Sequence, residues 1–340
     1  MQTQVNNIGN TNMIEGYAQW KHRFTDRFQL NTGVHLTYSV FNNKFYAEPR
    51  LGGDWQVKEN QTLSFGLGLH SRIDAMSTYF SYIDSSNGAK KYPNQHLDFS
   101  RAFHAVLGYN FSFKKDFRLK VEAYAQYLFS VPIGIDTSNS TYSIVNYNDG
   151  FVNIPLASKG TGYNYGLEIT LEKFFSHHYF FMYTASLYQS KYKAGDGVWR
   201  STAYDVHYVM NLLGGKEFVF GKKKNNIFGI NLKLIWRGGQ RYTPVDLNAS
   251  IANNETIYQN QNAFSQKFPD YFRMDGGVYI RRSLKKYSWT FSVDFQNIIN
   301  RLNVESEVYD PASRSIIITK NLGIIPVLAW KIEFGIKPKH

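Results

Sequence analysis

The stretch RLKVEAYAQYLF at residues 118–129 decides the fold of this chain, together with SWTFSVDFQ at residues 288–296. In the second stretch, apolar side chains at Trp289, Phe291, Val293 and Phe295 alternate with polar ones. Side chains on a β-strand point to opposite faces in turn, so each stretch has one apolar and one polar face. Segments of about ten residues with this period, ending in aromatic residues, are typical of transmembrane β-barrels. We therefore predict an all-β, antiparallel transmembrane barrel wall.

Composition agrees with a barrel wall and excludes a helical membrane protein. The 340 residues include 26 Phe and 25 Tyr, and aromatic residues make up 17% of the chain. Such an excess fits the aromatic girdles at the two membrane interfaces. Mean hydropathy is −0.39, and no run reaches the ~18 consecutive apolar residues of a membrane helix. The alternative on periodicity alone is an aromatic-rich soluble β-sandwich.

The formal net charge of +12 raises the question of an acidic partner. Nucleic-acid-binding proteins gather Lys and Arg on one face or tail. Here the cations are scattered, and the KKK run at residues 222–224 is interpreted as a charged turn. No nucleic-acid partner is therefore expected. The chain has no cysteine, which removes disulfides, thiolate metal ligands and a cysteine nucleophile.

The pattern predicts thirteen strands joined by connectors of two alternating kinds. Short polar connectors are expected at 25–28, 58–61, 114–117, 176–178, 222–226 and 285–286, and mostly long ones at 74–100, 136–162, 195–204, 245–271 and 300–323, with 42–44 short. Antiparallel neighbours place alternate connectors on opposite rims, and outer-membrane barrels have short periplasmic turns and long extracellular loops. The predicted strands are 11–24, 29–41, 45–57, 62–73, 101–113, 118–135, 163–175, 179–194, 205–221, 227–244, 272–284, 287–299 and 324–336.

An odd number of strands is unusual, because bacterial single-chain barrels have even numbers. An open sheet edge in lipid leaves backbone groups unsatisfied at several kcal/mol each. We therefore expect further strands on the N-terminal side, or one strand more than counted. Residues 302–320, which contain Ile316, Ile317 and Ile318, are a candidate extra hairpin. The N-terminus has no basic segment followed by an apolar core, so we expect a removed signal or, as we favour, a longer protein.

Several segments resemble the barrel of TonB-dependent outer-membrane receptors of the type common in the Bacteroidota. They run in family order: NQHL at 94–97, AVLGY at 105–109, EAYAQ at 122–126, NYGLE at 164–168, YDVHY at 204–208, GGKEF at 214–218, GGQRYTP at 238–244, RMD at 273–275, DFQNIIN at 294–300 and a closing strand at 323–334. Family barrels have 22 strands, so the resemblance implies that residues 1–340 form the C-terminal part of one barrel domain. On this resemblance, we expect the plug domain and the N-terminal strands to lie outside these residues.

The resemblance also implies a function and a location. It implies a cell outer-membrane uptake receptor whose loops bind a nutrient, such as a siderophore, cofactor, glycan or peptide, for TonB-energised import. Implied partners are outer-membrane lipid, the remaining strands and plug domain from the same or another chain, and the TonB complex. A surface lipoprotein is a further candidate partner. The rival hypotheses are a passive porin-like channel and a secreted soluble β-protein that binds carbohydrate.

The candidate ligand-binding residues lie at the predicted external mouth. Arg237, Arg241 and Tyr242 end the predicted strand 227–244, where two guanidinium groups and a glycine pair suit an anionic or hydroxyl-rich ligand. The alternative is that this segment simply ends the strand. Aromatic rings of the long loops suit stacking on a sugar or cofactor, although packing of the loops against one another uses the same rings: Tyr79, Phe80, Tyr82 and Tyr92 in 74–100, and Tyr142, Tyr147 and Phe151 in 136–162.

No catalytic, metal or cofactor pattern occurs in the sequence, so neither an enzyme nor a cofactor is predicted. His177 and His178 are adjacent, so on a strand or turn they point apart and favour a polar periplasmic turn. The period assigns two sets of side chains. The expected lipid-facing set is Val121, Ala123, Phe291, Val293, Leu328, Trp330 and Ile332, and the expected lumen-facing set is Glu122, Gln126, Ser292, Asp294, Lys331 and Glu333.

Overall fold

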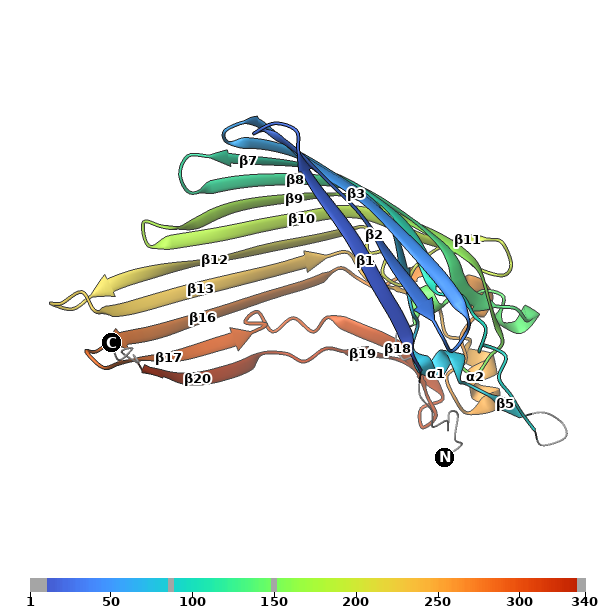
Figure 1. The fold of residues 1–340 in the computed structure, drawn as a ribbon. Helices are drawn as coiled ribbons and strands as arrows, with labels where there is room; N and C mark the ends of the chain where they lie inside the picture. The colour runs from blue at the N-terminus through green and yellow to red at the C-terminus, as the bar shows by residue number, and fades with distance from the viewer. Residues whose placement is uncertain (1–10, 85–88, 148–151, 335–340) are drawn as a thin grey trace.

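A computed structural model describes residues 11–84, 89–147 and 152–334 of the chain. Its main feature is one curved antiparallel sheet in which each strand pairs with its neighbours along the chain (Figure 1). The thirteen strands along the described path are β1 (Met13–Arg23), β2 (Phe28–Ser39), β3 (Lys44–Lys58), β4 (Gln61–Arg72), β7 (Ser100–Phe113), β8 (Phe117–Gly134), β9 (Leu156–Ser176), β10 (Tyr179–Lys193), β12 (Tyr208–Phe220), β13 (Asn226–Arg237), β16 (Tyr271–Ser283), β17 (Tyr287–Gln296) and β20 (Ile325–Phe334). β11 (Trp199–Ser201) adds to one end of β10.

The predicted all-β antiparallel wall is confirmed, strand for strand. Two boundaries differ by more than a few residues. β9 begins at Leu156 rather than at 163, because its first residues pair with the end of β8 through an irregular register. β13 ends at Arg237 rather than at 244, because the glycine pair that follows turns the chain out of the sheet, as described below.

The connectors sort onto two rims as the sequence predicts. Short turns at 24–27, 59–60, 114–116, 177–178, 221–225 and 284–286 lie at the left of Figure 1, and we call this end the turn rim. The loop rim, at the right, carries 40–43, 73–99, 135–155, 194–207, 238–270 and 297–324. Small elements within the loops are α1 (Met76–Tyr79), β5 (Ile83–Asp84), β6 (Lys90–Lys91), η1 (Thr137–Asn139), η2 (Ile144–Asn146), β14 (Arg241–Tyr242), α2 (Leu247–Asn253), η3 (Asn260–Asn262), β15 (Gln266–Lys267), β18 (Val304–Asp310) and β19 (Ser315–Lys320). No helix in the described residues is long and apolar enough to cross a membrane.

The strand registers place apolar side chains on one continuous face of the wall. Val293 stands opposite Val278 on one side and Leu328 on the other, so three neighbouring strands align their apolar positions. Trp330 on the edge strand is 73% exposed and Leu328 is 68% exposed. An apolar surface of this extent marks contact with lipid or protein. All seven residues of the expected lipid-facing set share this face.

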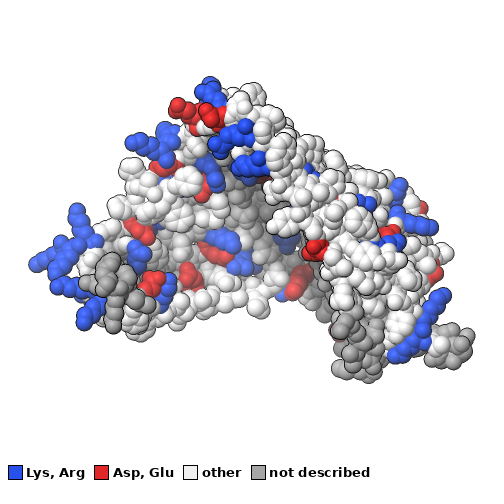
Figure 2. All heavy atoms as spheres, viewed as in Figure 1, with Lys and Arg blue, Asp and Glu red and all other residues white. Residues whose placement is uncertain are grey.

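The opposite, polar face lines the hollow of the curved sheet. Figure 2 shows acidic and basic side chains gathered inside this hollow. Ser292 stands opposite Ala329 and Tyr279, one residue out of phase with the apolar ladder. The expected lumen-facing residues share this second face, where Lys331 pairs with Glu333 at 2.7 Å. Water or paired charges therefore solvate the inner face, as the period predicts.

The sheet is not closed within the described residues. β1 and β20 are the two ends of the strand order and do not pair with each other. Within the described residues β20 pairs with β17 alone, so its other backbone edge is unpaired, and every residue of β20 is exposed. The hairpin predicted within 302–320 exists as β18 and β19, but these strands pair only with each other at the loop rim. It therefore adds no strand to the wall.

The largest buried cluster lies under the loops rather than in the wall. Tyr46 of β3 stacks on Phe99 with ring centroids 4.3 Å apart, and fully buried Tyr79 packs in the same cluster. Asn94, also fully buried, ties two loops together: it donates to the Ile154 carbonyl at 3.0 Å and accepts from the Leu156 amide at 2.9 Å. The loops thus pack around a hydrophobic core at the loop rim, whereas the wall is a single layer of strands.

Candidate ligand-binding site at the loop rim

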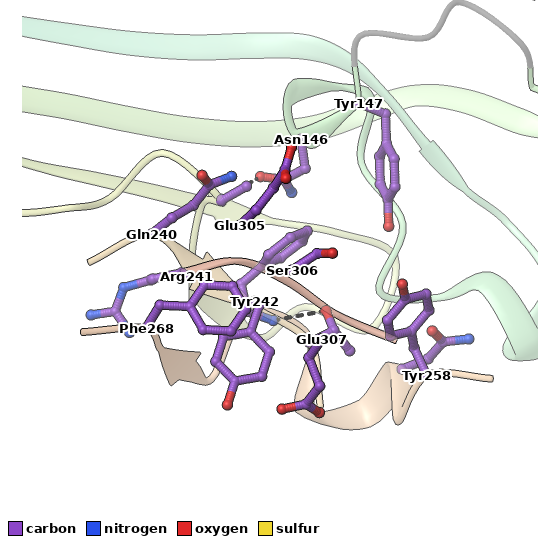
Figure 3. Close-up of a pocket in the computed structure, with 14 residues that line it drawn as sticks. Asn146, Tyr147, Gln240, Arg241, Tyr242, Tyr258, Phe268, Glu305, Ser306 and Glu307 are labelled. Atoms are coloured by element: carbon purple, nitrogen blue, oxygen red, sulfur yellow. Dashed lines mark hydrogen bonds between the residues drawn. The ribbon is translucent and has the colours of Figure 1, made fainter. Parts of the chain in front are cut away.

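A groove of about 340 Å³ opens among the loops of the loop rim (Figure 3). Loops 135–155, 194–207, 238–270 and 297–324 all contribute to it. Its volume lies at the lower end of the range of small-molecule sites. The lining residues are Asn146, Tyr147, Ala203, Gln240, Arg241, Tyr242, Thr243, Tyr258, Asn260, Phe264, Phe268, Glu305, Ser306 and Glu307. Three of them, Tyr147, Arg241 and Tyr242, were candidates from the sequence.

The pair Gly238-Gly239 carries Arg241 and Tyr242 out of the wall and into the groove. A Cβ on Gly238 would overlap the Val206 carbonyl, and one on Gly239 would overlap the Phe268 carbonyl. Only glycine allows backbones to approach this closely. The chain then forms β14, which pairs with β15, and Tyr242 stacks face to face on Phe268 with centroids 3.9 Å apart. The glycine pair is therefore the reason that the strand ends at Arg237.

Arg241 is held by partners from the loop 194–207. Its Nε donates to the Asp205 carbonyl at 3.2 Å and lies 3.5 Å from the Asp205 carboxylate. Its Nη2 lies 3.0 Å from Nε2 of His207, whose Nδ1 lies 3.5 Å from the same carboxylate. The Asp205 side chain is 0% exposed, and a buried carboxylate requires such a partner. The charge of Arg241 is thus balanced by a buried anion.

Two carboxylates enter the groove from β18, and the sequence patterns did not point to either. Glu307 accepts a hydrogen bond from the Val245 amide at 3.2 Å. Burial, reinforced by this carboxylate, raises the pKa of Tyr242 and keeps its phenol protonated. Glu305 sits where the β18–β19 register shifts, between Val304 and Ser306, and such a bulge re-aims a side chain. A register irregularity of this kind has no sequence signal.

A column of aromatic rings borders the groove on the side of loop 135–155. Tyr142 stacks on Tyr147 with centroids 4.7 Å apart, and Tyr147 meets the edge of Phe264 at 6.4 Å. Phe264 in turn packs against fully buried Tyr192 of β10 at 6.2 Å. This column anchors Tyr147 on the wall while 43% of that residue stays exposed. The rings that sequence reasoning missed here are Phe264, Phe268 and Tyr258.

The remaining sequence candidates lie outside the groove. Tyr79 is 0% exposed and packs edge-on against Phe41 in the loop core, where Phe80 and Tyr142 also pack. Tyr82 lies 6.2 Å from Tyr92, with the Lys90 ammonium 4.0 Å from its ring. Arg237 stacks over Tyr271 at 4.7 Å at the end of the wall. Phe151 lies outside the described residues. Ligand binding by these side chains stays a prediction.

The described residues offer no cluster of three His, Asp or Glu side chains that suits a metal ion. His177 and His178 form the two-residue turn between β9 and β10, at the turn rim. What the groove provides is aromatic surface, side-chain amides and two carboxylates. These groups bind an organic ligand by stacking, hydrogen bonding and charge.

No protein-family model and no curated protein matches the sequence. Solved structures do match. The ferric-catecholate import receptor Fiu from Escherichia coli K12 aligns with a TM-score of 0.62 at 12% identity over 95% of this chain and 44% of that receptor. The ferric yersiniabactin uptake receptor FyuA from Yersinia pestis gives 0.62 at 10% identity over 95% and 45%. The ferripyoverdine receptor of the Pseudomonas aeruginosa outer membrane gives 0.60 at 11% over 95% and 38%.

These likenesses define the class of fold: the chain has the fold of the barrel of TonB-dependent receptors, left open as a partial cylinder. The similar structures are transport receptors rather than enzymes. The chain spans less than half the length of each of the three receptors.

Proposed function

We propose that this chain is part of the barrel wall of an outer-membrane uptake receptor of the TonB-dependent type, as found in the Bacteroidota. The observation that carries the proposal is the two-faced sheet: one continuous apolar face, one hollow polar face, and loops gathered on a single rim. Such a sheet is stable when lipid covers the apolar face and water fills the hollow. The similar fold of known outer-membrane receptors supports the same conclusion.

The chain acts as the C-terminal part of a 22-stranded barrel that other strands complete. Two unpaired edges support this view, because an unsatisfied sheet edge does not persist in the hydrocarbon region. A barrel of 22 strands leaves a lumen wide enough to hold a plug. The completing strands, the plug domain and the TonB complex are the partners that energised import requires. Outer-membrane lipid covers the apolar face, and a surface lipoprotein is a further partner above the loop rim.

The loop-rim groove captures the nutrient before it passes through the lumen. Its position among four loops and its stacked rings support this role. The similar receptors are described for ferric catecholate, ferric yersiniabactin and ferripyoverdine. For this chain the candidate nutrients are a siderophore, cofactor, glycan or peptide.

Arginine substitutions on adjacent residues of β17 test the membrane assignment. Val293 faces outward and Ser292 inward. Val293→Arg is expected to destabilise the protein in a bilayer by about 2–4 kcal/mol, because a guanidinium on the lipid face must leave water. Ser292→Arg, the matched control, is expected to cost little. Urea unfolding from lipid vesicles measures both. Equal tolerance of the two substitutions, or a monodisperse monomer obtained without detergent, would overturn the proposal.

A further inference from the structure

The loops around the groove are acidic in a chain that is strongly basic. Three of the four loops that contribute to the groove, 194–207, 238–270 and 297–324, carry eight Asp and Glu side chains against six Lys and Arg, whereas the whole chain has a net charge of +12. The basic residues gather elsewhere, notably at the turn rim on the left of Figure 2. A cleft lined by one sign of charge concentrates ligands of the opposite sign. The local charge therefore bears on what the groove binds.

The two carboxylates of β18 supply this negative charge inside the groove. Glu305 is exposed, and the described residues give it no hydrogen bond or ion pair. Glu307 accepts from the Val245 amide at 3.2 Å and also interacts with the Tyr242 hydroxyl, and because both donors are neutral its charge stays uncompensated. Figure 3 shows the two side chains on opposite sides of the same strand, Glu305 beside Asn146 and Glu307 pointing away from it, so they offer two separate anionic contacts.

Arg241, the cation in the lining, does not neutralise them. Its guanidinium is engaged by the buried Asp205 carboxylate, the Asp205 carbonyl and His207. The Arg241–Asp205 pair is neutral as a unit, so Glu305 and Glu307 leave the groove with an excess of negative charge. An anionic ligand would have to enter against that charge.

Aromatic faces next to these carboxylates complete a site for an organic cation. Tyr147 and Tyr258 line the groove and are 43% and 44% exposed. The negative face of a tyrosine ring attracts a cation placed over it. The side-chain amide of Gln240 also lines the groove, and its carbonyl oxygen suits N–H and O–H donors. The side-chain oxygen of Asn146 already accepts from the Ala203 amide at 2.9 Å.

We propose that the groove binds a ligand that carries several primary ammonium groups, one held at the Glu305 carboxylate and another at the Glu307 carboxylate, with its body stacked against tyrosine. This inference rests on the proposed receptor function and narrows its substrate class to cationic oligomers. Two sources share this chemistry, basic oligopeptides and amino-sugar oligomers. A metal ion does not fit, because no third ligand joins the two carboxylates in the described residues.

Four probes test the proposal by calorimetric titration of the full chain in detergent micelles at low salt. They are trilysine and the glucosamine trimer, each beside its fully N-acetylated form, in which every ammonium group is replaced by a neutral amide. We expect at least one cationic probe to bind saturably, and its acetylated form to bind at least about tenfold more weakly. Binding of trilysine alone identifies the peptide source, and binding of the glucosamine trimer alone identifies the amino sugar. Equal binding of charged and acetylated forms, or no binding of either cation, overturns the proposal.

Isosteric variants locate the binding. Glu305→Gln and Glu307→Gln together are expected to weaken binding of the cationic probe by roughly tenfold to a hundredfold, since each removes a charge-assisted contact. Glu255→Gln, an exposed position of loop 238–270 outside the groove, is the matched control and should leave affinity unchanged. Tyr258→Phe should retain binding and Tyr258→Leu should weaken it. A Glu255→Gln effect equal to that of the double variant would mean diffuse attraction and contradict the site.

The outcome is separable from the proposed function. If the protein needs detergent and tolerates Ser292→Arg but not Val293→Arg, yet binds neither cationic probe, then this inference is wrong and the proposed function stands. A protein that is soluble without detergent sinks the receptor function, whatever it binds.

Discussion

The two rims of the sheet are built by different means. At the turn rim, connectors as short as residues 177–178 join neighbouring strands. The buried side chain of Lys173 links two of these turns, because it contacts Asp116 at 3.3 Å and donates to the carbonyls of Ser176 and Tyr179. At the loop rim, residues far apart in the chain meet, as when Asn94 bonds Ile154. The turn rim therefore depends on local pairing, and the loop rim depends on a core. The candidate groove lies at the loop rim, where that core positions its residues.

Removing a ring from the loop core should produce the largest change. Tyr79→Ala leaves a cavity in the cluster of Tyr46, Leu97 and Phe99, and we expect a loss of about 3–5 kcal/mol from the stability of the loop rim. Hydrogen exchange of loops 73–99 and 135–155 measures it, while the amides of β16 and β17 should not change. Tyr79→Phe removes only a hydroxyl that accepts at 3.4 Å from the Asp74 amide, so a similar loss there would contradict a packing role.

Removing the Lys173 contacts at the turn rim should have a smaller effect on stability. Lys173→Met removes the donor shared by several carbonyls while its side chain is 2% exposed, and we expect a loss of about 1–3 kcal/mol. Lys115→Met, on the exposed part of the same turn, is the control. Exchange of the amides flanking 114–116 and 177–178 reports the change. If both lysine variants behave alike, the turn rim is held by strand pairing alone.

The two rims should respond to pH in opposite directions, with the smallest effect of the three. At the loop rim, burial raises the pKa of Asp74 above its ordinary 3.8. At the turn rim, the Ser176 hydroxyl and then Lys173 lower the pKa of Asp116 below that value. A carboxyl whose pKa is raised by folding stabilises the folded state at pH values below its unfolded pKa, and this stability is lost as pH rises through the folded pKa. A carboxyl whose pKa is lowered by folding stabilises the folded state above its unfolded pKa, and this stability is lost as pH falls through the folded pKa.

Hydrogen exchange corrected for its intrinsic pH dependence, measured across about pH 3–6, tests this opposition. We expect protection of loop 73–99 to fall as pH rises, and protection of the turn rim to fall as pH drops. Asp74→Asn should flatten the first profile only, and Asp116→Asn the second only. Parallel profiles at the two rims would show that neither carboxyl responds as its surroundings require.

The wall was predictable from the sequence and the groove only in part. A period of two is local, so strands such as β8 and β17 follow from their own residues. Tyr147 was predicted in a long loop, and Arg241 and Tyr242 were predicted at the end of a strand; all three line the groove. Glu305 was not predicted, because its position depends on a bulge in β18. Nothing in the sequence separates Tyr79, which packs in the core, from Tyr147, which borders the groove; contacts between distant loops decide that.

The central claim is that alternate side chains of the wall touch hydrocarbon and water. Because the native chain has no cysteine, single cysteines from Ser288 to Phe295 in β17 take spin labels cleanly. In lipid vesicles, collision rates with oxygen, which concentrates in lipid, and with a water-soluble nickel complex should alternate out of phase with a period of two. Oxygen should dominate at 289, 291, 293 and 295, and nickel at 288, 290, 292 and 294. Uniform accessibility along the strand, or a period other than two, would contradict the account.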